Sequence, residues 1–136
     1  MNKRKLVTDR GNEVTFTKIV INRCYGGFSV SEAAIQRYSE LKGKELLFDY
    51  MDNNERFKSY YYMEDGRKNY VNPYNLTNRT DPVLIQVIEE LGSEKASGYG
   101  ADLFIDELEA GTLYRIAEYD GQEWIETKDD IEWSVA

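Results

Sequence analysis

Hydrophobic residues near the start of the chain follow two different periods. Apolar and polar positions alternate over 14–17 and are followed by the continuous run Ile19-Val20-Ile21. This pattern predicts a strand over 14–24 that is buried on both faces at its far end and is central in its sheet. After the pair Gly26-Gly27, apolar residues recur at helical spacing and predict a helix that runs to about Lys42.

The two predicted helices have recognisable ends. Ser29 and Glu32, three residues apart, have the form of a capping box at the start of the first helix. Gly43 supplies the left-handed residue that follows this helix. Asp81-Pro82 predicts the start of the second helix, with a carboxylate at the N-cap and proline at the first helical position. Gly92 is expected to end it.

Shorter patterns predict the remaining strands. Residues 45–50 form a short strand, and the tyrosine-rich segment 52–80 is expected to be a variable hairpin or loop, with strands over 57–63 and 68–71 around an Asp65-Gly66 turn. Its tyrosines suit either a binding interface or cross-strand pairing. An irregular loop is expected over 72–78, and a loop over 93–100.

The last third of the chain predicts three strands. Residues 101–108 alternate as one strand, and 113–119 and 122–127 flank Asp120-Gly121, a strong signal for a two-residue hairpin. Ile131 and Trp133 are expected to dock on the core. The element order predicts an α+β fold, with a largely antiparallel sheet, two packed helices and a C-terminal β-hairpin.

Length and composition fit one domain over 1–136, in which 1–12 form a flexible arm or an edge strand. No apolar run approaches the roughly 18 residues of a membrane span, so we expect a cytoplasmic protein without a membrane partner. The net charge of −8 disfavours DNA and RNA as partners. The acidic surface is either simply solvated or mimics DNA toward a basic groove.

The reactive side chains argue against an enzyme. The chain has no histidine and one cysteine, Cys24, which removes the usual general base and most zinc sites. Neighbouring carboxylates such as Asp129 and Asp130 point apart on a strand or turn. We therefore expect no catalytic residues, no metal site and no cofactor.

The segment between the first strand and the first helix is the candidate ligand site. Backbone N–H groups and a helix N-terminus favour an anion at such a place, although a structural turn explains the two glycines as well. Arg79 lies close to the second helix and either binds a phosphate or pairs with Asp81 or a neighbouring carboxylate. Arg23 and Arg115 either line a shared groove or face solvent. The candidate ligand-binding residues are Arg23, Tyr25, Gly26, Gly27, Phe28, Ser29 and Arg79.

Three segments carry a resemblance to a widespread, largely uncharacterised family of small phage and prophage proteins. They are Lys18 to Ser31, Arg79-Thr80-Asp81-Pro82 with 87–92, and the hairpin segment 116–124. The members in question pass directly from the first helix to a shorter middle, so the resemblance implies that 52–80 is an insertion or a variable loop.

The chain also looks like the anti-defence sponge proteins that antagonise Thoeris or CBASS by sequestering the signalling nucleotide. This resemblance implies a non-enzymatic homo-oligomer in the host bacterial cytoplasm that counters host immunity. Its ligand would be a nucleotide signal of the cyclic ADP-ribose type or a cyclic oligonucleotide. The alternative is an acidic protein-interaction inhibitor of a host defence protein, either anti-CRISPR-like or nuclease-blocking.

Overall fold

A computed structural model describes residues 3–7, 13–51, 54–130 and 132–136, and shows a mixed α+β fold. Every ladder between its described strands is antiparallel. In chain order the elements are β1 (Lys3–Val7), β2 (Glu13–Asn22), α1 (Glu32–Leu41), β3 (Leu47–Met51), β4 (Asn54–Glu64), β5 (Arg67–Tyr70), α2 (Pro82–Leu91), α3 (Ser93–Ala96), β6 (Leu103–Glu109), β7 (Tyr114–Tyr119), β8 (Gln122–Thr127) and a 3-10 turn (Lys128–Asp130).

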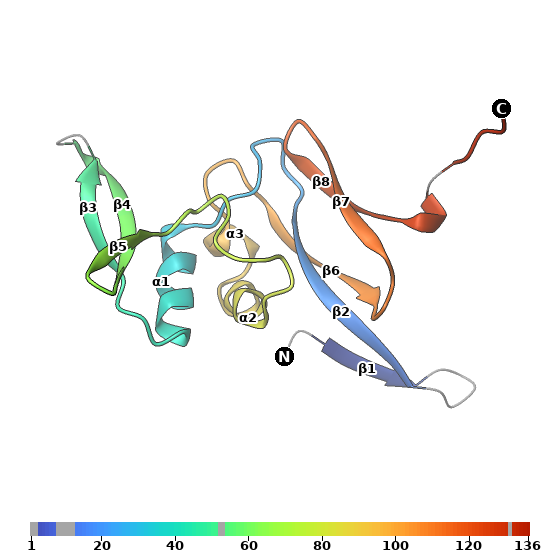
Figure 1. Ribbon diagram of the computed structural model, residues 1–136, viewed down its shortest axis with the longest axis horizontal. Helices are drawn as coiled ribbons and strands as arrows, with labels where there is room; N and C mark the ends of the chain where they lie inside the picture. The colour runs from blue at the N-terminus through green and yellow to red at the C-terminus, as the bar shows by residue number, and fades with distance from the viewer. Residues whose placement is uncertain (1–2, 8–12, 52–53, 131) are drawn as a thin grey trace.

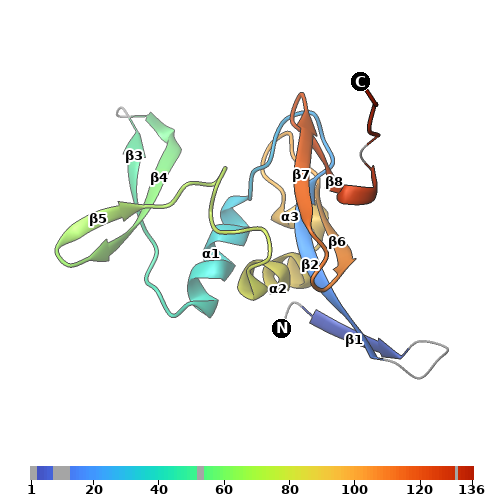
Figure 2. The same ribbon diagram turned by 45° about the vertical axis from the view of Figure 1, so that its right-hand side comes forward.

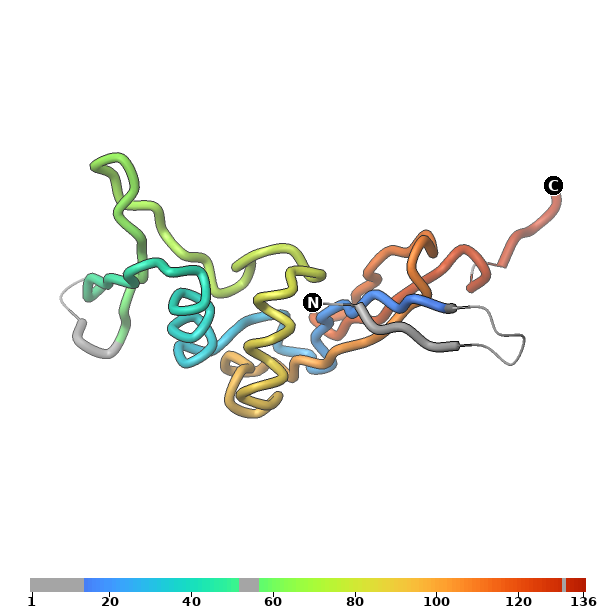
Figure 3. Tube along the Cα trace, turned by 90° about the horizontal axis from the view of Figure 1, so that it is seen from below, coloured from blue at the N-terminus to red at the C-terminus, as the bar shows by residue number. Residues whose placement is uncertain are grey.

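The strands form three sheets rather than the one sheet that the sequence suggested. The orders are β1-β2-β6, β3-β4-β5 and β7-β8. Figures 1 and 3 show the β3-β4-β5 sheet at one end of an elongated molecule and the other strands at the opposite end, with the helices between them. We call β3-β4-β5 the outer sheet.

Strand β2 is the central strand of its sheet, as predicted. Its residues Ile19, Val20 and Ile21 are buried, although they point to alternate faces. Val20 belongs to the core that α1 and α2 complete. Strand β8, which comes from the C-terminal part of the chain, also contacts β2 (Figure 2). β1 pairs with the first part of β2, from Glu13 to Thr17, and lies at the edge of its sheet.

The helices carry the core between the two sheets. Buried side chains of α1 and α2 pack together with Val20, Phe28 and Leu103. Asp81 caps α2 as predicted, because its carboxylate accepts the Val83 N–H at 2.8 Å.

The outer sheet confirms the predicted strands of the tyrosine-rich segment and the turn at Asp65-Gly66. Tyr61 and Tyr70 are cross-strand partners with ring centroids 5.9 Å apart, so this pair follows the cross-strand explanation. Tyr62 reaches α1, where its hydroxyl lies 2.7 Å from the Ser39 hydroxyl.

The predicted hairpin between β7 and β8 is also present. Asp120 and Gly121 have φ values of 51° and 91°, which are the two positive values that a type I′ turn requires. The hairpin turn therefore forms as its sequence indicates.

Three local predictions were wrong. The N-cap of α1 is Ser31, not Ser29: the Ser31 hydroxyl accepts the Ala34 N–H at 3.1 Å. The expected loop after Gly92 contains the short helix α3. Trp133 does not dock on the core, because 77% of its surface is exposed; Ile131 lies outside the described residues.

Candidate functional site

The predicted glycine turn is closed by the protein's own backbone. A Cβ on Gly26 would collide with the carbonyl group of Gly100, and one on Gly121 would collide with the Tyr25 carbonyl and the Gly27 nitrogen. Three loops thus meet here at distances that only glycine permits. This close approach accounts for Gly26 without a ligand.

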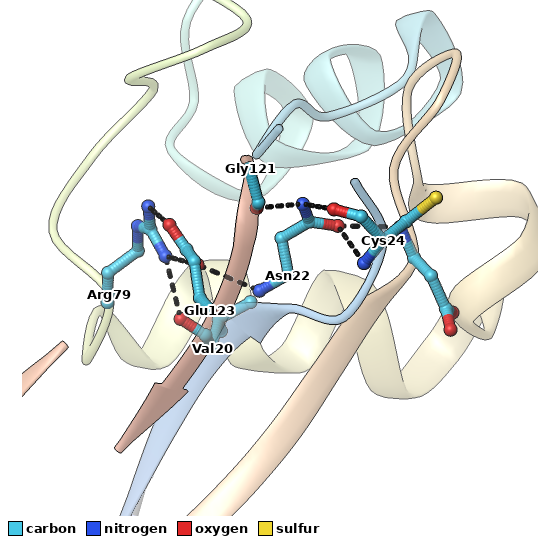
Figure 4. Close-up of polar contacts among 7 residues, drawn as sticks. Val20, Asn22, Cys24, Arg79, Gly121 and Glu123 are labelled. Atoms are coloured by element: carbon cyan, nitrogen blue, oxygen red, sulfur yellow. Dashed lines mark hydrogen bonds and ion pairs between the residues drawn. The ribbon is translucent and has the colours of Figure 1, made fainter. Parts of the chain in front are cut away.

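Arg79 is bound by a carboxylate of the same chain (Figure 4). Its guanidinium donates to both oxygens of Glu123, at 2.7 and 2.9 Å, and stacks 3.6 Å from the ring centroid of Phe28. Glu123 is 7% exposed. Arg79 therefore pairs with a carboxylate of the chain, but with Glu123 of β8 rather than with Asp81, which binds Tyr38 and Thr77 instead. A planar bidentate pair is the strong form of such a contact.

The same two residues also complete the open edge of β2. Beyond the part paired with β1, the Val20 N–H donates to the Arg79 carbonyl at 2.8 Å, and the Val20 carbonyl accepts from the Arg79 guanidinium at 3.1 Å. The Asn22 N–H donates to Glu123 Oε1 at 2.8 Å. Arg79 and Glu123 satisfy backbone groups that a neighbouring strand would otherwise bind.

Asn22 joins this cluster to the hairpin turn. Its fully buried side-chain amide donates to the carbonyls of Cys24 and Gly121, at 2.7 and 2.8 Å, and its oxygen accepts the Asp102 N–H at 2.8 Å. We call Asn22, Arg79 and Glu123 the internal polar cluster. It fixes the β2 end, the hairpin and the loop before β6 relative to one another.

Sequence reasoning missed Asn22 and Glu123, although each left a signal. Asn22 directly follows the apolar run Ile19-Val20-Ile21 at the end of β2, where a polar residue must find partners inside the fold. Glu123 lies on the same face of its strand as Ile125, opposite the exposed Trp124. The alternation therefore places its carboxylate inward.

The other candidate residues divide between packing and the surface. Ser29 and Phe28 are buried. Tyr25 is exposed, and Arg23, also exposed, stacks 3.2 Å from the ring centroid of Phe104. The structure brings Phe28 and Arg79 together at Glu123, whereas Gly26 and Gly27 lie against the loops of Gly100 and Gly121.

A cleft elsewhere in the molecule is lined by lysine, tyrosine and asparagine side chains. It lies between the C-terminal end of α1, the outer sheet and the segment that follows β5, and has a volume of about 340 Å³, within the range of ligand pockets. We call it the lysine–tyrosine cleft. Its lining consists of Tyr38, Lys42, Lys44, Tyr62, Asn69, Tyr70, Val71, Asn72, Asn75 and Leu76.

Charge distinguishes this cleft from the rest of the surface. The chain carries 25 acidic against 17 basic residues, yet the lining holds two lysines and no carboxylate. Lys44 Nζ lies 4.9 Å from the ring centroid of Tyr62. Cations beside aromatic rings suit a ligand that is both anionic and aromatic.

Hydrogen bonds hold the walls of the cleft. The Tyr38 hydroxyl donates to Asp81 at 2.7 Å. Burial, which is the largest influence, and the neighbouring carboxylate raise the pKa of Tyr38 to about 12, so its phenol is neutral at physiological pH. Tyr70, in contrast, is 59% exposed and presents its ring to solvent.

No protein-family model matches this chain, and no curated protein or solved structure shows significant similarity to it. Within the described residues, no three acidic or cysteine side chains are grouped so as to hold a metal ion. None of the described helices has the length and apolar character to cross a membrane.

Proposed function

We propose that this chain is a non-enzymatic binding protein that sequesters a small nucleotide signal in the lysine–tyrosine cleft. The observation that carries the proposal is the lining of the cleft, with two lysines, three tyrosines and three asparagines in a strongly acidic chain. The lysines attract phosphate, the tyrosine rings stack on a base, and the asparagine amides hydrogen-bond base edges or ribose hydroxyls.

The chemistry of the lining favours binding over reaction. It offers no carboxylate or thiol as base or nucleophile, and the hydroxyls of Tyr38 and Tyr62 are engaged with Asp81 and Ser39. A bound nucleotide would leave the cleft unchanged.

The biological setting in the proposal rests on the resemblance to small phage proteins. We propose an accessory protein that counters host immunity in the bacterial cytoplasm by removing a cyclic ADP-ribose-type or cyclic oligonucleotide signal. A cyclic oligonucleotide is larger than one such cleft, which favours a homo-oligomer that offers two clefts to one ligand.

Calorimetry with cyclic ADP-ribose isomers and with cyclic di- and trinucleotides tests the proposal. At least one of them should bind, and Lys44→Gln should weaken its binding by roughly tenfold because a charge-assisted contact is lost. Lys95→Gln, a matched change on α3 outside the cleft, and Arg23→Gln should leave it unchanged. Absence of binding to every nucleotide would refute the proposal.

A second candidate function, inhibition of a host defence protein, has its own observation. An apolar cleft of about 470 Å³ opens on the other side of the segment after β5, with Phe57 (61% exposed) and Tyr74 (70% exposed) in its lining. The buried hydroxyl of Tyr60, also in this lining, has no hydrogen-bond partner among the described residues. A protein partner could fill such a site with an apolar side chain and a polar group.

The two candidates differ in what Phe57→Ser and Lys44→Gln do. If the chain inhibits a protein, Phe57→Ser abolishes recovery of a stoichiometric host protein while Lys44→Gln does not. If it sequesters a nucleotide, heat denaturation of the purified protein releases an intact nucleotide, and only Lys44→Gln lowers the amount released.

A further inference from the structure

Glu64 does not line the lysine–tyrosine cleft, yet it holds two of the donors that do. Its Oε1 accepts from Lys44 Nζ at 3.0 Å, and its Oε2 accepts from Asn69 Nδ2 at 3.0 Å. Glu64 is the last residue of β4, whereas Lys44 precedes β3 and Asn69 lies on β5. One carboxylate therefore ties together three segments of the cleft wall.

The contact has two opposite consequences for the binding of a ligand. It orders the long side chain of Lys44, which lowers the entropy lost when a ligand binds. It also places a negative charge beside the cation that would attract a phosphate. The hydrogen bond from Lys44 lowers the pKa of Glu64, so the carboxylate remains ionised at neutral pH.

The other lysine of the cleft lacks a comparable clamp in the described structure. Lys42 Nζ lies 5.9 Å from the ring centroid of Tyr38, and no carboxylate lies within ion-pair distance of it among the described residues. Lys42 therefore attracts an anion whatever the charge at position 64, and the part of the attraction that a competing carboxylate sets is that of Lys44.

We propose that Glu64 is a positioning residue that sets the selectivity of the cleft between phosphate-bearing and neutral ligands. An incoming phosphate competes with Glu64 for Lys44, whereas a neutral nucleoside binds the wall that Glu64 keeps ordered. This inference rests on the proposed function of the cleft as a nucleotide site. It assigns to Glu64 a role that a purely structural ion pair would not have.

Two substitutions separate position from charge. Glu64→Gln keeps an oxygen that accepts from Lys44, and its NH2 group can donate to Asn69 once the Asn69 amide turns to present its oxygen, but the negative charge is removed. Glu64→Ala removes both. Glu94→Gln, on α3 and outside the cleft, makes the same change in net charge and serves as the control.

The experiment measures binding of pyrophosphate and of adenosine to the full chain by calorimetry at low salt. Glu64→Gln should bind pyrophosphate roughly fivefold more tightly than the wild type, because one competing charge near the surface is removed. Its affinity for adenosine should stay within about twofold, whereas Glu64→Ala should bind adenosine more weakly. The gain for pyrophosphate should shrink in high salt, and Glu94→Gln should match the wild type.

The other outcomes separate the role of Glu64 from the proposed function of the cleft. If Glu64→Gln and the wild type bind pyrophosphate equally, or neither binds it, the role of Glu64 is wrong. If a cyclic nucleotide binds both proteins equally well, the role of Glu64 is wrong and the proposed function stands. If Glu64→Gln tightens pyrophosphate binding but no cyclic nucleotide binds any variant, the role of Glu64 stands and the proposed function is wrong.

Discussion

Replacing Arg79 with alanine tests whether this arginine belongs to a ligand site or to the fold. The substitution removes the bidentate contact with Glu123, the hydrogen bond to the Val20 carbonyl and the stacking on Phe28. It also leaves the Glu123 carboxylate buried without its cation. If Arg79 were instead a ligand-binding residue, its replacement would cost the protein little stability, because the free protein contains no ligand to pair with it.

The structure sets the size of the expected loss. Breaking a buried ion pair by removing one partner costs about 3–5 kcal/mol. The side chain of Glu123 is 6% exposed but that of Arg79 is 23% exposed, so water reaches one side of the pair and the lower end of the range applies. We expect a loss of about 3 kcal/mol in the free energy of unfolding, which corresponds to a fall of roughly 10 °C in Tm for a chain of this size.

Urea denaturation followed by tryptophan fluorescence and scanning calorimetry measure this loss. Arg37→Ala is the matched control, because Arg37 makes an equivalent bidentate contact with Glu90 at an exposed site, and it should change stability far less. Arg79→Met combined with Glu123→Gln should recover part of the loss, since no buried charge then remains unpaired.

A loss for Arg79→Ala below about 1 kcal/mol, as small as that of exposed pairs, would refute this reasoning. So would a double variant that is less stable than Arg79→Ala alone, because the buried charge of Glu123 would then not be the source of the loss. Either result would reopen Arg79 as a ligand-binding residue.

Other parts of the fold give further predictions. Gly26→Ala should cost at least about 2 kcal/mol in a urea titration, because the backbone at Gly100 cannot yield to a new Cβ. Asn22→Ala should cost about 3 kcal/mol in the same assay, since backbone groups of three other residues lose their partner. Burial alone would raise the pKa of Asp81, but hydrogen bonds from Tyr38 and two other groups outweigh it and lower the pKa below 3.8. Asp81 therefore stabilises the fold above its ordinary pKa and loses this contribution as the pH falls; urea midpoints between pH 6 and pH 2 should fall less steeply for Asp81→Asn.

The sequence predicted those elements whose signals are local. Asp81-Pro82 and Asp120-Gly121 specify a helix start and a hairpin turn through their own backbone preferences, and both occur where expected. The start of α1 was misplaced because tertiary contacts decide it. The Ser29 carbonyl accepts the Gly98 N–H, and the Val30 N–H donates to the Pro73 carbonyl, so this stretch stays extended and the cap moves to Ser31.

The lysine–tyrosine cleft shows a different limit of sequence reasoning. Its tyrosines were noticed as a group, but Lys42 and Lys44 lie in the segment after α1 and Tyr38 lies inside that helix. Only the packing of the outer sheet against α1 brings them together. A site built from separate segments leaves no periodic pattern in the sequence. The sequence therefore indicated the glycine turn, where most of the candidate residues are adjacent to one another.

An anion is bound near this region, but by Arg79 and not by the glycine turn. An arginine beside a strand end and a helix start binds a carboxylate by the same bidentate geometry as a phosphate. In this chain the anion is Glu123, supplied by β8, and its oxygen also replaces a missing strand partner for Asn22. A sequence pattern for anion binding does not say whether the anion comes from solution. In this chain the alternation of buried and exposed residues along β8 gives the answer. It places the Glu123 carboxylate on the inward face, where a carboxylate must find a cation inside the fold.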